Sequence, residues 1–253
     1  MDRSIEGLGI RPFSARSLVL SVLLGLQDPR LPRPAAFRLA DVFGIAPGAM
    51  RTALSRLVGS GDLTLDDQGY ELTGRLLERK RAQDTGRPSP RATWDGSWWV
   101  VLVTVANRDV GARREFRTHM INARMGELRP ECWLRPSNIA DPVGLTDLDG
   151  VVAVRGALTG LDPATMARRL WDLDAIAARC RWLLARLGEP PKTATALPDA
   201  MLVSAAVVRF LREEPLLPAA LTPDGWPVDD LRRMYREYDR DFGRVLRSVI
   251  DEP

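Results

Sequence analysis

The stretch GIAPGAMRTALSRLVGSG, residues 44–61, decides how the N-terminal part of the chain folds. It opens with a tight turn that ends at Pro47, and proline is favoured in the first turn of a helix. Beyond the turn, apolar residues recur at intervals of three and four, the spacing of one helix face. The stretch therefore predicts a turn followed by a helix over about 47–58. The apolar face of this helix carries Met50, Leu54, Leu57 and Val58.

Elements on both sides of this stretch complete a recognisable order. Residues 14–26 and about 35–43 have helical apolar spacing and are separated by prolines. After the central helix, two short alternating segments at 62–65 and 70–73 flank the turn Asp66-Asp67-Gln68-Gly69, which predicts a hairpin. Helix, short helix, turn, helix and hairpin is the order of a winged helix-turn-helix. The sequence thus predicts such a module in its first 84 residues.

A winged helix-turn-helix binds DNA mainly through the helix after the turn, which enters the major groove. Arginine can bind guanine bidentately, and serine or threonine hydroxyls reach phosphates or bases. We also expect a phosphate contact from the second helix and a contact from the hairpin tip, where two aspartates would repel phosphate. The residues expected to contact DNA are Arg51, Thr52, Ser55, Arg56, Arg38 and Gln68.

The middle of the chain has a different composition. A charged helix at 74–83 leads into a polar linker at 85–93 that is rich in proline, glycine and serine. A β-prone run at 100–105, a helix at about 110–125 and two further strands at 131–135 and 150–156 follow. This pattern favours a small α+β sandwich of ferredoxin-like type.

From Pro163 onward the pattern is entirely helical. We expect one long helix over 164–187 and further helices at about 198–213 and 228–250. The predicted fold class is α+β multidomain, with an N-terminal winged helix-turn-helix, a central ferredoxin-like α+β domain and a C-terminal all-α domain. The predicted boundaries are 1–84 for the DNA-binding domain, 85–93 for the linker, 94–160 for a dimerisation domain and 161–253 for an effector-binding domain.

Composition limits the function classes. With 45% apolar and 27% charged residues, the chain resembles an ordinary globular protein. No uncharged apolar run approaches about 18 residues, and no cleavage-like site follows the apolar stretch at 18–26, so we expect a cytoplasmic protein without a membrane partner. Only two of the 36 basic residues are lysine, and arginine suits phosphate and guanine recognition, although codon usage alone could explain this bias.

The chemistry-bearing residues do not favour an enzyme. Cys132 and Cys180 are the only cysteines and His119 is the only histidine, so neither a disulfide framework nor a zinc site is expected. A catalytic triad would rest entirely on His119, which lies in a predicted helix. We therefore expect no catalytic residues, no metal and no cofactor.

Several segments resemble the PaaX family, the phenylacetate-pathway repressors. The segment MRTALSRLV at 50–58 resembles the recognition-helix segment of that family, and WDG at 94–96 resembles the opening of its central domain. LWDL at 170–173 resembles the start of its long C-terminal helix, and EPLLP at 214–218, with Trp-Pro at 226–227, resembles its late proline-rich signature. The matches occur in the family's order and extend along most of the chain.

The resemblance implies a dimeric repressor that binds double-stranded operator DNA, controls an aromatic-catabolism operon and is released by an aryl-acyl-CoA such as phenylacetyl-CoA. The central domain of the family is also similar to a CRISPR-associated nuclease fold whose first strand carries a metal-binding acid. Here the strand end carries Thr104, and the missing carboxylate argues against nuclease activity. A homodimer interface is the favoured use of that domain.

Two alternatives stay open. A winged helix can serve protein contacts alone, and an enzyme, either a nuclease or an acyl-CoA-processing enzyme, is disfavoured by the lone His119 and by Thr104. Trp171 and Trp226 could line an aryl pocket, but large aromatics beside leucine-rich helices more often pack a core. The arginines that could meet CoA phosphates could equally form a solvated face, so no effector site is assigned. They are Arg168, Arg169, Arg179, Arg181 and Arg186.

Overall fold

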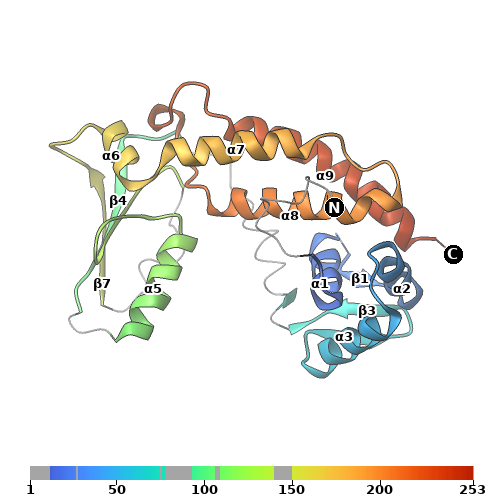
Figure 1. Ribbon diagram of the computed structural model, residues 1–253. Helices are drawn as coiled ribbons and strands as arrows, with labels where there is room; N and C mark the ends of the chain where they lie inside the picture. The colour runs from blue at the N-terminus through green and yellow to red at the C-terminus, as the bar shows by residue number, and fades with distance from the viewer. Residues whose placement is uncertain are drawn as a thin grey trace. The chain divides into compact units, whose positions relative to one another are not determined.

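The computed structural model describes residues 12–26, 28–74, 76–77, 93–105, 109–139 and 150–252. It is a mixed helix and sheet structure with two compact units (Figure 1). The first unit comprises Met1–Arg87, Leu183–Val207 and Asp230–Pro253, and the second comprises Pro88–Trp182 and Val208–Asp229. The C-terminal segment thus contributes to both units. The predicted three-domain division remains a prediction.

Three helices form the start of the first unit: α1 (Ala15–Gly25), α2 (Arg33–Val42) and α3 (Pro47–Gly59). They lie close to the ranges that apolar spacing predicts. Ser14 and Ser17 form a capping box that fixes the start of α1, and prolines occupy the first turns of α2 and α3. The apolar faces meet in a core of fully buried residues that includes Leu18, Leu23, Leu39, Met50, Leu54 and Leu57.

A small antiparallel sheet follows α3. The hairpin strands β2 (Leu63–Asp66) and β3 (Gly69–Leu72) pair as predicted, and a two-residue strand β1 (Arg30–Leu31) adds on the other side of β3. The turn depends on Gly69, whose φ of 132° is suited to glycine and whose Cβ, if present, would collide with the backbone of Leu31. The hairpin is therefore set tightly against β1.

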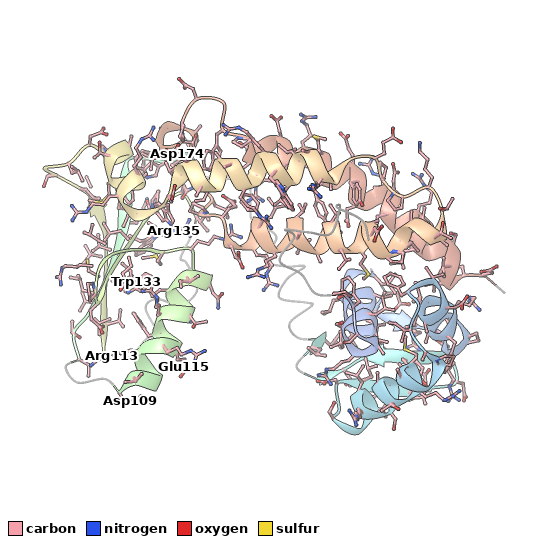
Figure 2. The ribbon with its side chains drawn as sticks, viewed as in Figure 1. Asp109, Arg113, Glu115, Trp133, Arg135 and Asp174 are labelled. Carbon is pink, nitrogen blue, oxygen red and sulfur yellow. The ribbon has the colours of Figure 1, made fainter. Side chains whose placement is uncertain are left out.

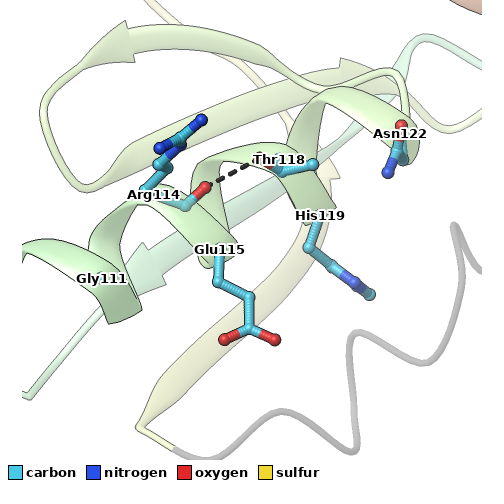
Figure 3. Close-up of a pocket in the computed structure, with 6 residues that line it drawn as sticks. All are labelled: Gly111, Arg114, Glu115, Thr118, His119 and Asn122. Carbon is cyan, nitrogen blue, oxygen red and sulfur yellow. Dashed lines mark hydrogen bonds between the residues drawn. The ribbon is translucent and has the colours of Figure 1, made fainter.

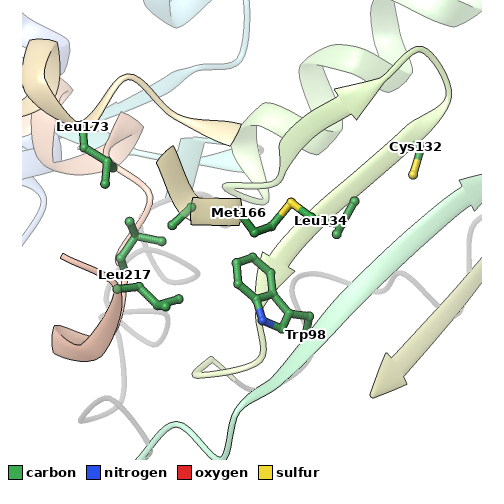
Figure 4. Packing of buried hydrophobic residues seen from close by; sticks show 8 residues of the cluster. Trp98, Cys132, Leu134, Met166, Leu173 and Leu217 are labelled. Carbon is green, nitrogen blue, oxygen red and sulfur yellow. The ribbon is translucent and has the colours of Figure 1, made fainter. Parts of the chain in front are cut away.

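The second unit is built on a sheet with the order β5-β6-β4-β7 and antiparallel neighbours throughout. Its strands are β4 (Ser97–Val103), β5 (Gly126–Arg129), β6 (Cys132–Pro136) and β7 (Val151–Ala157). One face packs on α5 (Val110–Asn122) through Val101, Met120 and Trp133. The other face packs on α6 (Pro163–Leu170) around Trp98, Leu134 and Met166 (Figure 4).

One sequence prediction in this part of the chain is wrong, and one strand was not predicted. The single helix expected over 164–187 is instead two helices, α6 and α7 (Leu173–Leu187), because Trp171 is extended and Asp172 accepts a hydrogen bond from the Ala175 N–H at 2.9 Å, as an N-cap does. Strand β5 was not predicted, since it is short and carries charged residues. It fits closely under α6, where a Cβ on Gly126 would lie 2.7 Å from Leu170 Cβ.

Helices α8 (Leu197–Glu213) and α9 (Val228–Ile250) complete the chain, with short 3₁₀ turns at Ala194–Ala196 and Ala219–Leu221. In the first unit, the Tyr235 hydroxyl is 2.8 Å from that of Ser204, and Tyr238 donates to the Ala200 carbonyl at 3.3 Å. Within the described residues, only the helical stretch Ala194–Glu213 is long and apolar enough to span a membrane. A core helix of a soluble protein passes the same test, and 44% of the 18-residue apolar window in this stretch is buried.

Aromatic residues are divided between the units. All seven tryptophans of the sequence fall within the residue ranges of the second unit, and all three tyrosines fall within those of the first. The helix predicted over 74–83 and the linker over 85–93 lie largely outside the described residues.

Candidate nucleic-acid interface

The solvent-facing side of α3 carries the four residues that the sequence predicts for it. Arg51, Thr52, Ser55 and Arg56 are all exposed, while the apolar side is buried. Within the described part of the chain, neither arginine makes an ion pair. Their guanidinium donors are therefore available to an external acceptor.

Thr52 differs from its neighbours in one respect. Its hydroxyl donates to the Gly48 carbonyl one turn earlier, at 2.9 Å. A hydroxyl used in this way does not donate to a phosphate, so in this rotamer Thr52 offers chiefly its methyl group. Such a methyl group can pack against the thymine methyl in the major groove.

The hairpin tip is organised by Arg30, which sequence reasoning missed. Its guanidinium bonds to Asp66 at 2.8 Å, to Gln68 Oε1 at 2.9 Å and to Glu71 at 2.6 Å. The N–H of Gln68 and the guanidinium of Arg30 hold the pKa of Asp66 below its usual range. The charge of Asp66 is therefore paired with Arg30, and its carboxylate accepts the Gln68 and Gly69 N–H groups that shape the turn. Exposed Gln68 uses its oxygen on Arg30 and keeps its amide N–H groups as donors.

The structure does not bring Arg38 onto the α3 face. Its Nε donates to the Val249 carbonyl at 3.0 Å and its Nη2 donates to the Ile250 carbonyl at 2.7 Å. These carbonyls lie at the end of α9, so Arg38 caps a helix terminus. The predicted phosphate contact would have to use the three N–H groups of its guanidinium that these bonds leave.

The WDG segment at 94–96 has a structural explanation. Trp94 Nε1 donates to the Ser97 carbonyl at 2.7 Å, Asp95 accepts from the Ser97 N–H at 2.9 Å, and Gly96 adopts a φ of 85°. Hydrogen bonds from Ser97, with the charge of Arg155, lower the pKa of Asp95. The motif is a tight turn that introduces β4.

The EPLLP segment at 214–218 belongs to a buried polar network in the second unit. Glu214, which is 3% exposed, accepts from Arg124 at 3.5 Å and also from the Leu216 N–H at 2.9 Å. Arg124 further donates to the Glu214 carbonyl at 2.7 Å. It holds a left-handed φ of 60° at the end of α5, a position where glycine is usual. The bonds of Arg124 connect the segment to the turn between α5 and β5.

Arg135, which is labelled in Figure 2, is the second arginine of this network. Its exposed fraction is 1%. It donates to the Ala123 carbonyl at 2.9 Å and to Asn138 at 3.4 Å, and Asn138 in turn donates to the Leu216 carbonyl at 2.7 Å. Burial, reinforced by the nearby positive charge of Arg124, lowers the pKa of Arg135 to about 10. The network thus holds two arginines near the buried carboxylate of Glu214.

The groove along α5 is a poor match for the aryl group of an aryl-acyl-CoA thioester. A groove of about 450 Å³ runs along α5 (Figure 3), and its walls include Arg114, Glu115, Thr118 and His119. These side chains are polar and do not suit an aryl group. Trp171 and Trp226 pack against the core around Trp98. Among the residues that the structure describes, no three histidine, cysteine or acidic side chains are grouped to hold a metal.

Comparison with known proteins places the chain in a family. Residues 14–76 match the model for PaaX-like protein, and residues 91–146 match the model for the PaaX protein central Cas2-like domain. No curated protein sequence gives a significant match. A solved structure, the uncharacterized protein Rv0674 from Mycobacterium tuberculosis, is similar over 93% of this chain and 98% of its own, with 34% sequence identity and a TM-score of 0.77. The chain therefore belongs to the PaaX family of transcriptional regulators.

Proposed function

We propose that the protein is a DNA-binding transcriptional repressor whose α1–β3 region is a winged helix-turn-helix with α3 as its recognition helix. One observation carries the proposal. The exposed side of α3 presents Arg51 and Arg56 without ion pairs among the described residues, while its opposite side is buried. A helix with these properties beside a β-hairpin suits the major groove.

Each exposed side chain has a role that its hydrogen bonds allow. Arg51 and Arg56 bind guanine edges or phosphates, and the Ser55 hydroxyl donates to a phosphate. Thr52 contributes its methyl group because its hydroxyl is used within the helix. Gln68 donates from its amide nitrogen while Arg30 offsets part of the negative charge of Asp66 and Glu71.

The test is fluorescence anisotropy on labelled DNA from the intergenic region upstream of the gene, over a range of salt concentrations. We expect selective, salt-sensitive binding that R51A and R56A each weaken by roughly 5- to 150-fold, corresponding to about 1–3 kcal/mol per specific contact. R236A is the matched control, because exposed Arg236 lies on α9 and carries the same charge. Selective binding that survives R51A/R56A would contradict the assignment of α3.

Other outcomes point to the alternative functions. A protein that binds no DNA selectively but captures a protein partner would be a winged-helix interaction module. Magnesium-dependent cleavage of DNA, or turnover of an acyl-CoA, would indicate an enzyme. Both assays use the same purified full chain.

We further propose that the central domain has the ferredoxin-like fold and forms a homodimer. The order β5-β6-β4-β7 supports the fold, since it is the strand order of that architecture. The edge strand β7 supports the dimer, because Val152 and Val154 are 46% and 50% exposed on it. An antiparallel edge is self-complementary about a two-fold axis. V152K/V154K should convert the dimer to a monomer in analytical ultracentrifugation, and an unchanged mass would exclude this interface.

The inducer is proposed from the family alone. We propose an aryl-acyl-CoA such as phenylacetyl-CoA as the ligand that releases DNA, and an aromatic-catabolism operon as the target. Adding phenylacetyl-CoA to the preformed complex should restore the anisotropy of free DNA, whereas phenylacetate and free CoA should not. A complex that ignores all thioesters would discard this inducer and leave the DNA-binding proposal intact.

The remaining proposals concern layout and location. A repressor of this kind acts in the cytoplasm, with domains at 1–84, 94–160 and 161–253 joined by a linker at 85–93. Limited proteolysis of the native protein tests this layout. Cleavage concentrated in the linker would support it, and uniform resistance there would not.

A further inference from the structure

Arg38 connects two helices that are far apart in the sequence. It projects from α2, and its guanidinium forks onto two consecutive carbonyls at the end of α9, with N···O distances of 3.0 Å to Val249 and 2.7 Å to Ile250. The last four carbonyls of a helix have no partner within the helix, and the helix dipole places partial negative charge there. A planar, cationic fork is well suited to this position.

The end of α9 that Arg38 caps is packed. Leu246, Val249 and Ile250 are 5%, 5% and 7% exposed, and all belong to the first unit with α2. Arg38 is itself half-buried. The fork therefore holds a terminus that is already in the core, where fraying would expose apolar surface.

Helix α2 is also closely connected to α3. The turn between them is fixed by two backbone hydrogen bonds, from the Gly44 N–H to Asp41 at 3.0 Å and from the Ile45 N–H to Ala40 at 2.7 Å. The two helices pack directly on each other. A displacement of α2 would therefore be passed to α3.

We propose that Arg38 is a positioning residue that fastens the end of α9 to α2, so that the DNA affinity of α3 depends on the order of the last turn of α9. The proposal rests on the DNA-binding function above. The Arg38 contact also connects α9, whose first residues are grouped with the second unit, to the recognition helix α3 through α2.

This role differs from the phosphate contact that the sequence predicts for Arg38. A phosphate contact needs the positive charge, whereas a cap needs a fork that spans two carbonyls. Arg38→Lys keeps the charge and loses the fork, and Arg38→Gln loses both. Arg33→Gln, on the exposed first turn of the same helix, removes an equal charge without touching the cap.

The first measurement is amide hydrogen exchange of the full chain without DNA, which does not depend on the proposed function. R38Q and R38K should accelerate exchange of the amides at 246–251 by about tenfold, as expected when charge-assisted hydrogen bonds are lost. R33Q should leave those amides as they are in the unmodified protein. Unchanged exchange in R38Q would overturn the fastening role.

The second measurement is DNA affinity over a range of salt concentrations. If Arg38 acts through α9, R38K and R38Q should both weaken binding by roughly tenfold while the slope of log affinity against log salt stays the same. A phosphate contact would instead lower the slope by about one for R38Q, and R38K would bind nearly as the unmodified protein does. Accelerated exchange with undiminished affinity would overturn the coupling to α3. If the unmodified protein binds no DNA, the proposed function fails, while the exchange result still decides the fastening role.

Discussion

Two pairs of arginines, one pair in each unit, are used in opposite ways. In the first, Arg51 and Arg56 point into solvent from α3 and are bound to nothing in the described structure. In the second, Arg124 and Arg135 point inward and are held by backbone carbonyls and one buried carboxylate. The difference shows that the arginine-rich composition has no single meaning. The exposed arginines of α3 keep their donors for a partner, whereas the buried pair uses them to hold the fold.

Removal of the buried carboxylate should have the largest effect. Glu214→Ala removes the buried carboxylate that lies beside Arg124 and Arg135, and breaking a buried pair in this way typically costs about 3–5 kcal/mol. We expect the urea midpoint of the second unit to fall markedly when unfolding is monitored by circular dichroism. The control is Glu213→Ala, whose carboxylate pairs on the surface with Arg209 and should change stability by less than about 1 kcal/mol. If both variants lowered stability equally, the buried carboxylate would be no more important to the fold than the exposed one.

The outward arginines should affect binding and leave the fold unchanged. R51A/R56A should weaken DNA binding strongly while changing the free energy of unfolding by no more than about 0.5 kcal/mol, as is usual for exposed positions. Anisotropy and urea denaturation of the same preparation test both statements. A large loss of stability would mean that these arginines hold structure, as those of the second unit do.

Close packing in the second unit can be tested at Gly126. A Cβ there would lie 2.7 Å from Leu170 Cβ and 3.1 Å from the Trp171 ring, so Gly126→Ala should destabilise by about 1–3 kcal/mol. Gly156→Ala is the matched change on β7, since its Cβ would meet nothing within 4 Å. Urea denaturation should separate the two variants. Similar midpoints would show that β5 and α6 yield more easily than these distances indicate.

The smallest effect concerns alkaline pH and the first unit. Burial raises the pKa of Tyr238 to about 12 from its usual 10, so the unfolded chain loses this proton first. Stability from this group is complete below pH 10 and is lost as the pH rises toward 12. We expect the free energy of unfolding to fall over that range and to fall less steeply in Tyr238→Phe. The measurement is urea unfolding of both proteins at pH 9, 10 and 11. If the free energy of unfolding falls equally steeply with pH in both, Tyr238 is not the group responsible.

Local periodicity predicted most of the first unit. The helices at α1 to α3, the hairpin and the exposed side of α3 follow from the spacing of apolar residues, which is a short-range signal. The break between α6 and α7 was missed, although Asp172 is a residue type that favours N-caps. Heptad-like spacing continued through the break and concealed it.

Long-range contacts were beyond the sequence. Arg38 meets residues more than 200 positions away, and Arg124 meets Glu214 across 90 positions. No spacing rule connects such pairs. The sequence therefore suggested that the Arg38 side chain is available to contact a DNA phosphate. Arg30 was missed for a related reason, because β1 is only two residues long and has no periodicity to reveal its pairing with the hairpin.

The division of aromatic residues supplies built-in optical probes. Because every tryptophan belongs to the second unit, emission excited at wavelengths that only indole absorbs reports that unit alone. The phenol absorbance of the three tyrosines reports the first. Resonance energy transfer from phenol to indole would then follow the separation of the two units in solution, with and without DNA, without any attached dye.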